Sequence, residues 1–234
     1  MPERTRAALA LFAKAPRPGR VKTRLAAALG ARLAAEFHRE CVLVAWQRIS
    51  SLDGVDPFLY CDSQWAEFEA LAGGRRFRRQ RGGGLGPRML SCLDELLRSG
   101  YDRALIVGSD APTLPLRQVR EALAALDGAD AVLGPCADGG FTLIGASRTA
   151  PDMFRGVPWS TSGTRQACMR AMRAGGLTAA EAATEAYDVD TSADLERLVR
   201  DPALQAGLRR WLDRRLGALS QQLAASARPQ LPDH

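Results

Sequence analysis

A turn near the start of the chain concentrates positive charge between an apolar run and a helical pattern. Its five cationic residues are Lys14, Arg17, Arg20, Lys22 and Arg24. Pro16, Pro18 and Gly19 lie among them and stiffen the turn, because proline presets φ whereas glycine permits positive φ. Cations held in this way would bind a polyphosphate, and the N-terminus of the following helix would add to the attraction. The alternative is a solvated loop with scattered charges, but the coincidence of rigidity and charge favours an anion site.

An acidic residue follows the clearest buried strand of the sequence. Asp110 lies two residues beyond the apolar run 103–108, in the segment LIVGSDAPTLP. A magnesium–phosphate complex needs a hard oxygen ligand at such a place. A helix cap or a turn former would also explain an aspartate here, so this segment leaves both interpretations open.

The segment QRGGGLGPRM, residues 80–89, is nearly free of large side chains at its centre. Backbone without side chains can approach a flat or bulky ligand closely. An ordinary flexible loop has the same composition, so the spacing alone does not choose between the two.

Two further acidic segments come late in the chain. Asp138, Gly139 and Gly140 form a turn before an apolar run, which needs no function to explain it. Asp188 and Asp190 alternate, so in an extended segment both carboxylates would face one side. Thr191 and Asp194, which follow, have the spacing of an ordinary helix N-terminus.

Apolar runs alternate with helical patterns along most of the chain. We expect strands over 7–13, 55–60, 75–80, 103–108, 129–135 and 140–145. We expect one long helix over 25–44 and further helices over 65–71, 89–97, 116–126, 163–174 and 191–216, the last with a break near Asp201 and Pro202. Residues 177–187 are alanine-rich and favour a helix. The alternation predicts an α/β fold, a three-layer α/β/α sandwich with a mostly parallel sheet. Ligands bind outside the carboxyl ends of such strands.

Bulk composition sets limits on the class of protein. The formal net charge of +6 suits an anionic partner, which could be a phosphate ligand, a nucleic acid or a membrane surface. The five cysteines are scattered singly, which argues against a zinc site or a disulfide framework and favours a reducing cytoplasm. No apolar stretch has the length of a membrane span, and the N-terminal apolar run suits a first strand better than a signal peptide. We expect a single domain over 1–216 and a loose tail over 217–234.

Five segments in order resemble one known family. KAPRPGRVKTRL, GSDAPTL, DGGFTLIG, VPWST and DVDTSADL look like the motifs of the radical-SAM/selenodomain-associated transferase 1 family, over about residues 8–200. That family belongs to the nucleotide-diphospho-sugar transferase superfamily, which has a GT-A type α/β fold. More distant relatives include phospholactate guanylyltransferase and molybdenum-cofactor guanylyltransferase. The chain departs from the pattern in the glycine segment, where Gly84 and Pro87 replace two acidic residues.

The resemblance implies roles for individual residues. Asp110 and Asp190 would hold a divalent cation, Mg²⁺ or Mn²⁺, and Lys14, Lys22 and Asp110 would act in catalysis. The nucleotide would lie against Ala13, Arg17, Gly19, Arg24, Gly83, Gly84, Gly86 and Ser109. The acceptor or sugar would lie near Asp138, Gly139, Gly140, Trp159, Ser160 and Thr161.

The resulting hypothesis is a metal-dependent transferase that uses an activated nucleotide donor and a small-molecule acceptor. Nucleotidyl transfer and glycosyl transfer both develop negative charge on a leaving diphosphate, so both need the same cations. The cationic first turn suits a triphosphate and therefore favours nucleotidyl transfer. A catalytically inactive nucleotide-binding protein is the second alternative. A nucleic-acid-binding module would explain the arginines of 75–81, but aromatic residues make up only 6% of the chain and no known binding motif accompanies them. These patterns do not predict the base, the acceptor or the oligomeric state.

Overall fold

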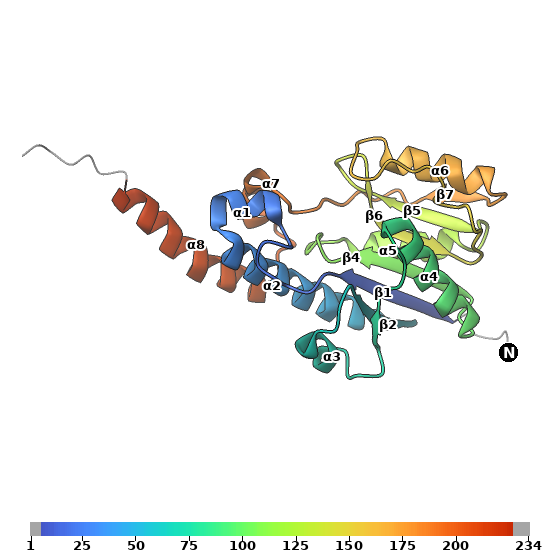
Figure 1. The fold of residues 1–234 in the computed structure, drawn as a ribbon, viewed down its shortest axis with the longest axis horizontal. Helices are drawn as coiled ribbons and strands as arrows, with labels where there is room; N and C mark the ends of the chain where they lie inside the picture. The colour runs from blue at the N-terminus through green and yellow to red at the C-terminus, as the bar shows by residue number, and fades with distance from the viewer. Residues whose placement is uncertain (1–5, 227–234) are drawn as a thin grey trace, which may run out of the picture.

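The computed structural model describes residues 6–226, and within them seven strands form one sheet in the order β3-β2-β1-β4-β6-β5-β7 (Figure 1). The strands are β1 (Ala7–Ala13), β2 (Val55–Cys61), β3 (Phe77–Arg79), β4 (Arg103–Gly108), β5 (Ala131–Pro135), β6 (Phe141–Ala146) and β7 (Ala179–Glu181). All of these pair in parallel except β6, which runs antiparallel to both of its neighbours, β4 and β5. The predicted mostly parallel sheet is confirmed.

The central strand β1 explains why the apolar runs become strands. All seven of its residues are buried, and it pairs with β2 on one side and β4 on the other. Such a strand must be apolar at every position, because helices cover both faces of the sheet. Its carboxyl end therefore lies in the middle of the molecule, next to the carboxyl end of β4.

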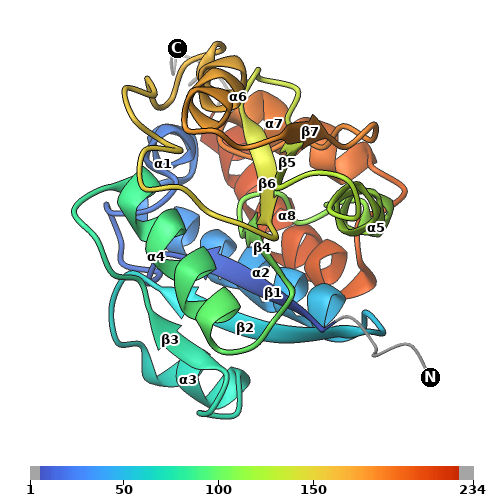
Figure 2. The same ribbon diagram turned by 90° about the vertical axis from the view of Figure 1, so that its right-hand side faces the viewer.

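Helices pack on both faces of the sheet and make three layers (Figure 2). The helices are α1 (Thr23–Leu29), α2 (Ala31–Ser50), α3 (Ala66–Leu71), α4 (Leu85–Arg98), α5 (Leu116–Ala125), α6 (Thr164–Ala174), α7 (Ser192–Arg200) and α8 (Ala206–Ser226). Buried side chains of α2, α3 and α5 share one core cluster with the sheet, and those of α4 and α6 share another. The α/β/α sandwich expected from the sequence is thus present.

A third core cluster lies apart from the sheet faces. It joins α1, α2, α7 and α8 through Leu25, Phe37, Leu198 and Trp211, among other buried residues. Figure 1 shows α1, α7 and α8 gathered beyond the end of the sheet toward which β1 points. This cluster fixes the first turn of the chain and the segment before α7 relative to each other.

Three expectations about elements are wrong. The single helix over 25–44 is two helices, because Gly30, at φ 77° and ψ 152°, ends α1 and begins α2. Residues 177–187 contain the edge strand β7 and an isolated bridge from Ala186 to Cys136 instead of a helix, since pairing with β5 overrides the helix propensity of alanine.

The third correction concerns the C-terminal part. Helix α8 continues to Ser226, past the boundary expected at residue 216, and the alanines, leucines and glutamines there are good helix formers even without an apolar stripe. The remainder of the expected tail, 227–234, lies outside the described residues. Across 6–226, no helix combines the length and the apolar character needed to cross a membrane.

Candidate functional site

The carboxyl ends of β1 and β4 bring the basic turn next to Asp110. These strands run in parallel, and the Ser109 amide, just past the end of β4, donates to the carbonyl of Phe12 in β1 at 3.1 Å. The next residue, Asp110, accepts through its backbone carbonyl from the Val189 amide at 2.9 Å. The segment containing Asp188 and Asp190 is thereby fastened to the same end of the sheet. This is the location at which open α/β sheets bind ligands.

Lys22 is the centre of this arrangement. It is the N-cap of α1, in a left-handed conformation with φ 47° and ψ 43°, and its side chain is 1% exposed. Its Nζ lies 2.5 Å from Asp110 Oδ1 and 3.2 Å from Asp190 Oδ1. The residues that the sequence singled out as a cation and as two metal ligands therefore meet, with the ammonium between the carboxylates.

The pKa values of this group reflect the pairing. Burial alone would lower the pKa of Lys22, but the negative groups around it, Asp110 first and Asp190 among them, together outweigh burial and the pKa lies above its ordinary value. Burial would likewise raise the pKa of Asp110, and the Lys22 ammonium instead holds it well below its usual range. Both groups are therefore charged near neutral pH, and Lys22 serves as the counter-ion of the two aspartates.

His38, which the sequence analysis did not single out, completes the floor of the site. Its ring lies on α2, with a side chain only 3% exposed. Nε2 is 3.0 Å from the Lys14 carbonyl oxygen, and Nδ1 is 3.6 Å from Asp110 Oδ1. The sequence did carry a signal that His38 is buried. It stands three and four residues before Cys41 and Val42, both on the buried side of α2.

Only part of the basic turn faces the site. Lys14 and Arg24 line the cleft described below, whereas Arg17 and Gly19 do not. The guanidinium of Arg17 lies 3.4 Å from the Ser63 hydroxyl on the exposed side of the turn. The base of the turn is fixed by a hydrogen bond of 2.8 Å from the Ala15 amide to Asp62 Oδ1.

A second carboxylate pair lies beside the first. Asp138, Asp188 and Cys136 offer ligand atoms that all lie within 4.8 Å of one another. Burial, and after it the charge of Asp110, raises the pKa of Asp188 to about 7. Thr191 and Asp194 form the capping box of α7, as their spacing in the sequence predicted. Asp190, just before them, lines the cleft.

These groups open into a cleft of about 790 Å³, a volume that suits a small-molecule ligand. Of the residues predicted from the sequence, the cleft is lined by Ala13, Lys14, Arg24, Gly84, Ser109, Asp110, Asp138, Gly140, Trp159, Ser160, Thr161 and Asp190. The remaining predicted residues do not line it, namely Arg17, Gly19, Lys22, Gly83, Gly86 and Gly139. Residues to which the sequence analysis assigned no role also line it, including His38, Arg88, Phe141 and Thr142, and so does Asp188, which it had paired with Asp190.

The glycine segment leads into α4, with Gly84 as the N-cap. Pro87 sits in the first turn, where a helix needs no backbone donor. A Cβ at Gly86 would come within 2.9 Å of Trp159 Cζ2, so this glycine lets α4 pack against the Trp159 segment. Its role is packing between two walls of the cleft rather than close backbone approach to a ligand.

The opposite wall is built around the Asp138–Gly140 turn. Asp138 Oδ1 accepts from the Gly140 amide at 2.8 Å, which closes the turn. Gly139, at φ 85°, leaves no room for a side chain, since a Cβ would meet the Ser162 carbonyl oxygen at 2.1 Å. Trp159 packs edge-on against Phe141, with ring centroids 6.4 Å apart. Beside the carboxylate of Asp138, this wall thus offers aromatic and hydroxyl groups.

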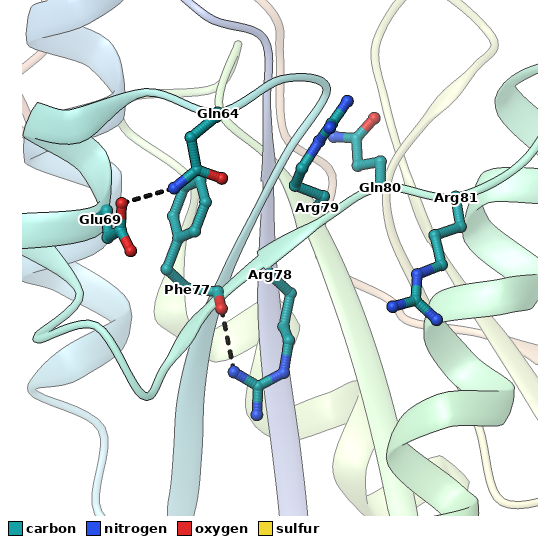
Figure 3. A pocket seen from close by; sticks show the side chains of 7 residues that line it. All are labelled: Gln64, Glu69, Phe77, Arg78, Arg79, Gln80 and Arg81. Carbon is teal, nitrogen blue, oxygen red and sulfur yellow. Dashed lines mark hydrogen bonds between the residues drawn. The ribbon is translucent and has the colours of Figure 1, made fainter.

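A second hollow, of about 520 Å³, lies by the edge strand β3 (Figure 3). It is lined by Gln64, Glu69, Phe77, Arg78, Arg79, Gln80 and Arg81. Arg78 is engaged locally, with its guanidinium donating to the Phe77 carbonyl and lying 5.7 Å from the Phe58 ring centroid. Gln80 separates this hollow from the cleft, because it lines both.

Comparisons with known proteins agree with this fold. The crystal structure of a protein from Desulfovibrio desulfuricans G20, assigned provisionally as a nucleotide-diphospho-sugar transferase, is similar with a TM-score of 0.77 and 32% identity over 91% of this chain and 97% of that one. CMP:2-keto-3-deoxy-manno-octonic acid synthetase, complexed with CTP, shares the fold at a TM-score of 0.52 and 13% identity over 82% and 96% of the two chains.

Bifunctional IspDF from Campylobacter jejuni also shares the fold, at a TM-score of 0.52 and 11% identity over 82% of this chain and 53% of that one. No curated protein sequence matches the chain. A family profile described as "Uncharacterized protein conserved in bacteria (DUF2064)" matches residues 45–161. The chain therefore belongs to the DUF2064 family, with the GT-A-like fold of the nucleotide-diphospho-sugar transferases.

Proposed function

We propose that this protein is a divalent-metal-dependent transferase that takes an activated nucleotide as its donor and transfers the nucleotidyl group to a small phosphorylated or hydroxyl acceptor. The observation that carries the proposal is the contact of Lys22 with both Asp110 and Asp190, whose side chains line the same cleft as Lys14 and Arg24. Carboxylates that can bind a metal ion and basic side chains that can bind phosphates then face the same cavity. A metal–polyphosphate complex requires both.

The donor set fits Mg²⁺ or Mn²⁺. Four carboxylates line the cleft, from Asp110, Asp138, Asp188 and Asp190, and Lys22 balances two of them. Burial raises the pKa of Asp188 to about 7, and the neighbouring charge of Asp110 is the second cause. Hard oxygen ligands gathered in this way attract a divalent cation. Asp110 and Asp190 would hold the ion, which when bound would neutralise charge on the leaving diphosphate.

Other side chains of the cleft would bind the donor, orient the aspartates and bind the acceptor. Lys14 and Arg24 would bind the phosphates of the donor from the β1 side of the cleft. Lys22 would keep the two aspartates oriented, since its Nζ contacts both. The wall formed by Asp138, Trp159 and Thr161 would bind the acceptor or sugar, because aromatic faces and hydroxyls suit a neutral polar group.

Glycosyl transfer from a nucleotide-diphospho-sugar is the alternative with specific support. The relative that is 32% identical is assigned to that class of enzyme, and the same cations would stabilise the leaving nucleoside diphosphate. The resemblance of the motifs to the radical-SAM/selenodomain-associated transferase 1 family is compatible with either reaction. The five free, buried cysteines support the cytoplasmic setting that we infer for it.

The test is a screen of the full-length protein against all nucleoside triphosphates and common nucleotide sugars, with Mg²⁺ or Mn²⁺. Thermal shift reports binding, released pyrophosphate reports nucleotidyl transfer, and released nucleoside diphosphate reports glycosyl transfer. Binding without either product supports an inactive nucleotide-binding protein. We expect Asp110→Asn to abolish metal-dependent nucleotide binding, whereas Asp152→Asn, an exposed control, leaves it unchanged. Unchanged binding in Asp110→Asn would refute the assignment of the site.

A further inference from the structure

The ring of His38 lies between the first turn and the acidic floor of the cleft. One edge of the ring faces the carbonyl oxygen of Lys14 and the other faces the carboxylate of Asp110. The residue is 2% exposed and still lines the cleft. Each nitrogen of this buried imidazole is therefore a candidate for a contact with the chain or with a ligand in the cleft.

The Lys14 carbonyl fixes the tautomer of the ring. A carbonyl oxygen only accepts, so the contact of 3.0 Å requires that Nε2 carries hydrogen and donates. In the neutral ring Nδ1 then presents a lone pair. Nδ1 has no hydrogen-bond partner, and its separation of 3.6 Å from Asp110 Oδ1 is longer than a hydrogen bond.

An unpaired buried nitrogen of this kind costs free energy unless something binds it. The local arrangement is that of a metal-binding histidine, in which one ring N–H donates to a backbone carbonyl and directs the other nitrogen to the ion. Zinc, for example, binds imidazole nitrogen and carboxylate oxygen at about 2.1 Å. Two ligand atoms 3.6 Å apart can therefore share one ion.

We propose that His38 Nδ1 and Asp110 Oδ1 are ligands of one and the same metal ion, and that the nitrogen makes the site select a transition-metal ion such as Mn²⁺ over Mg²⁺. The inference rests on the proposed function, because it concerns the ion of that cleft. Magnesium prefers oxygen ligands, whereas imidazole nitrogen suits transition metals. Lys22 Nζ, at 2.5 Å from the same oxygen of Asp110, competes with the ion.

The experiment measures coordination directly, with Mn²⁺ alone and full-length protein, by pulsed electron paramagnetic resonance. The sequence contains only two histidines, His38 and His234, so isotopic labelling of histidine nitrogen assigns any coupling. We expect a histidine-nitrogen coupling to Mn²⁺ in the wild type and in His234→Ala, and its loss in His38→Gln. We also expect His38→Gln to weaken Mn²⁺ binding by roughly tenfold or more while Mg²⁺ binding changes far less.

The variants are chosen so that a folding defect does not obscure the answer. His38→Gln retains an amide that can donate to the Lys14 carbonyl but lacks the imidazole nitrogen, and His38→Asn offers an amide oxygen near the position of Nδ1 instead. Thermal unfolding without metal checks that both fold. If neither folds, the coupling in labelled wild-type protein still decides the question.

The negative outcomes have different meanings. Mn²⁺ binding that depends on Asp110 but shows no histidine-nitrogen coupling would overturn the role of His38 and leave the proposed function intact. Failure of Mn²⁺ to bind while Mg²⁺ still binds would overturn the role of His38 alone. Failure of both ions to bind, with or without a nucleotide, would overturn both proposals.

Discussion

Two segments of this chain, 14–24 and 75–81, each carry five cationic residues, but the fold places them in different surroundings. The turn that contains Lys14, Lys22 and Arg24 follows the central strand β1 and meets Asp110 and Asp190 in a cleft. The arginine run of 75–81 surrounds β3, at the edge of the sheet, where Arg78 folds back on its own strand and Phe58.

The difference shows that local charge density does not define a site. A segment at the centre of a parallel sheet is surrounded by the carboxyl ends of neighbouring strands, so its cations meet groups from distant parts of the chain. A segment at an edge has neighbours on one side only, and its cations remain in solvent or make local contacts. The predictions below test this contrast in order of expected effect.

The largest effect is expected for Lys22→Met. Removal of the ammonium leaves Asp110 and Asp190 without a counter-ion, so we expect activity to fall by roughly a hundredfold and the metal-free protein to lose about 1–3 kcal/mol of stability. Added Mn²⁺ should restore part of that stability, because the ion replaces the missing charge. Thermal melts with and without metal measure this. The exposed control Arg79→Met should melt like the wild type, and equal melting of Lys22→Met without metal would contradict the counter-ion role.

The next effect concerns the cations that are free to bind phosphate. Lys14→Ala and Arg24→Ala should each weaken nucleotide binding by roughly tenfold, as expected for the loss of a charge-assisted contact. Arg79→Ala and Arg81→Ala change the same charge in the edge segment and should leave binding unaltered. Isothermal titration calorimetry with the nucleotide found in the screen compares the two cleft variants with the two edge variants. An equal loss in all four variants would mean that net charge, not position, governs binding.

A smaller effect, on stability alone, is expected for Arg78→Ala. This guanidinium lies over the Phe58 ring and 3.4 Å from Glu95, both partly exposed contacts. Their loss should cost about 0.5–1 kcal/mol in chemical denaturation. Nucleotide affinity should not change, and a parallel loss of affinity would assign the edge hollow to the donor site.

The smallest effect is expected within the basic turn itself. Arg17 does not line the cleft and touches only the Ser63 hydroxyl through its side chain among the described hydrogen bonds. Arg17→Ala should therefore change nucleotide affinity by less than roughly twofold, in the range of exposed surface charges. A loss as large as that of Arg24→Ala would show that the turn closes over the donor when it binds.

Much of the fold could be predicted because the relevant signals are local. The apolar runs that became β1 and β4 are read from consecutive residues, and the capping box of Thr191 and Asp194 from a three-residue spacing. The strand β7 could not be predicted, since alanine favours helix and only the pairing with β5 makes it extended. The break at Gly30 was hidden because the apolar pattern continues through both helices.

The same distinction applies to the site. Lys14 follows from residue type and from its position after a predicted strand, whereas the choice of Asp110 and Asp190 as metal ligands rests on the resemblance of their motifs to a known family. His38 was missed because a single histidine inside a helical pattern has no local signal for the groups that it faces. Gly86 was assigned to nucleotide binding, although its contact with Trp159 is a matter of packing between distant segments.

The sequence by itself determined the strands, the stiffened cationic turn and the presence of acids just beyond strand ends, because each depends on neighbours within a few residues. Only the tertiary structure decided that Lys22 lies between Asp110 and Asp190, the latter 168 residues away. That pairing depends on strand order and on the packing of α1 against α7 and α8, which no local pattern encodes. The charges existed in the sequence, but their convergence is a property of the fold.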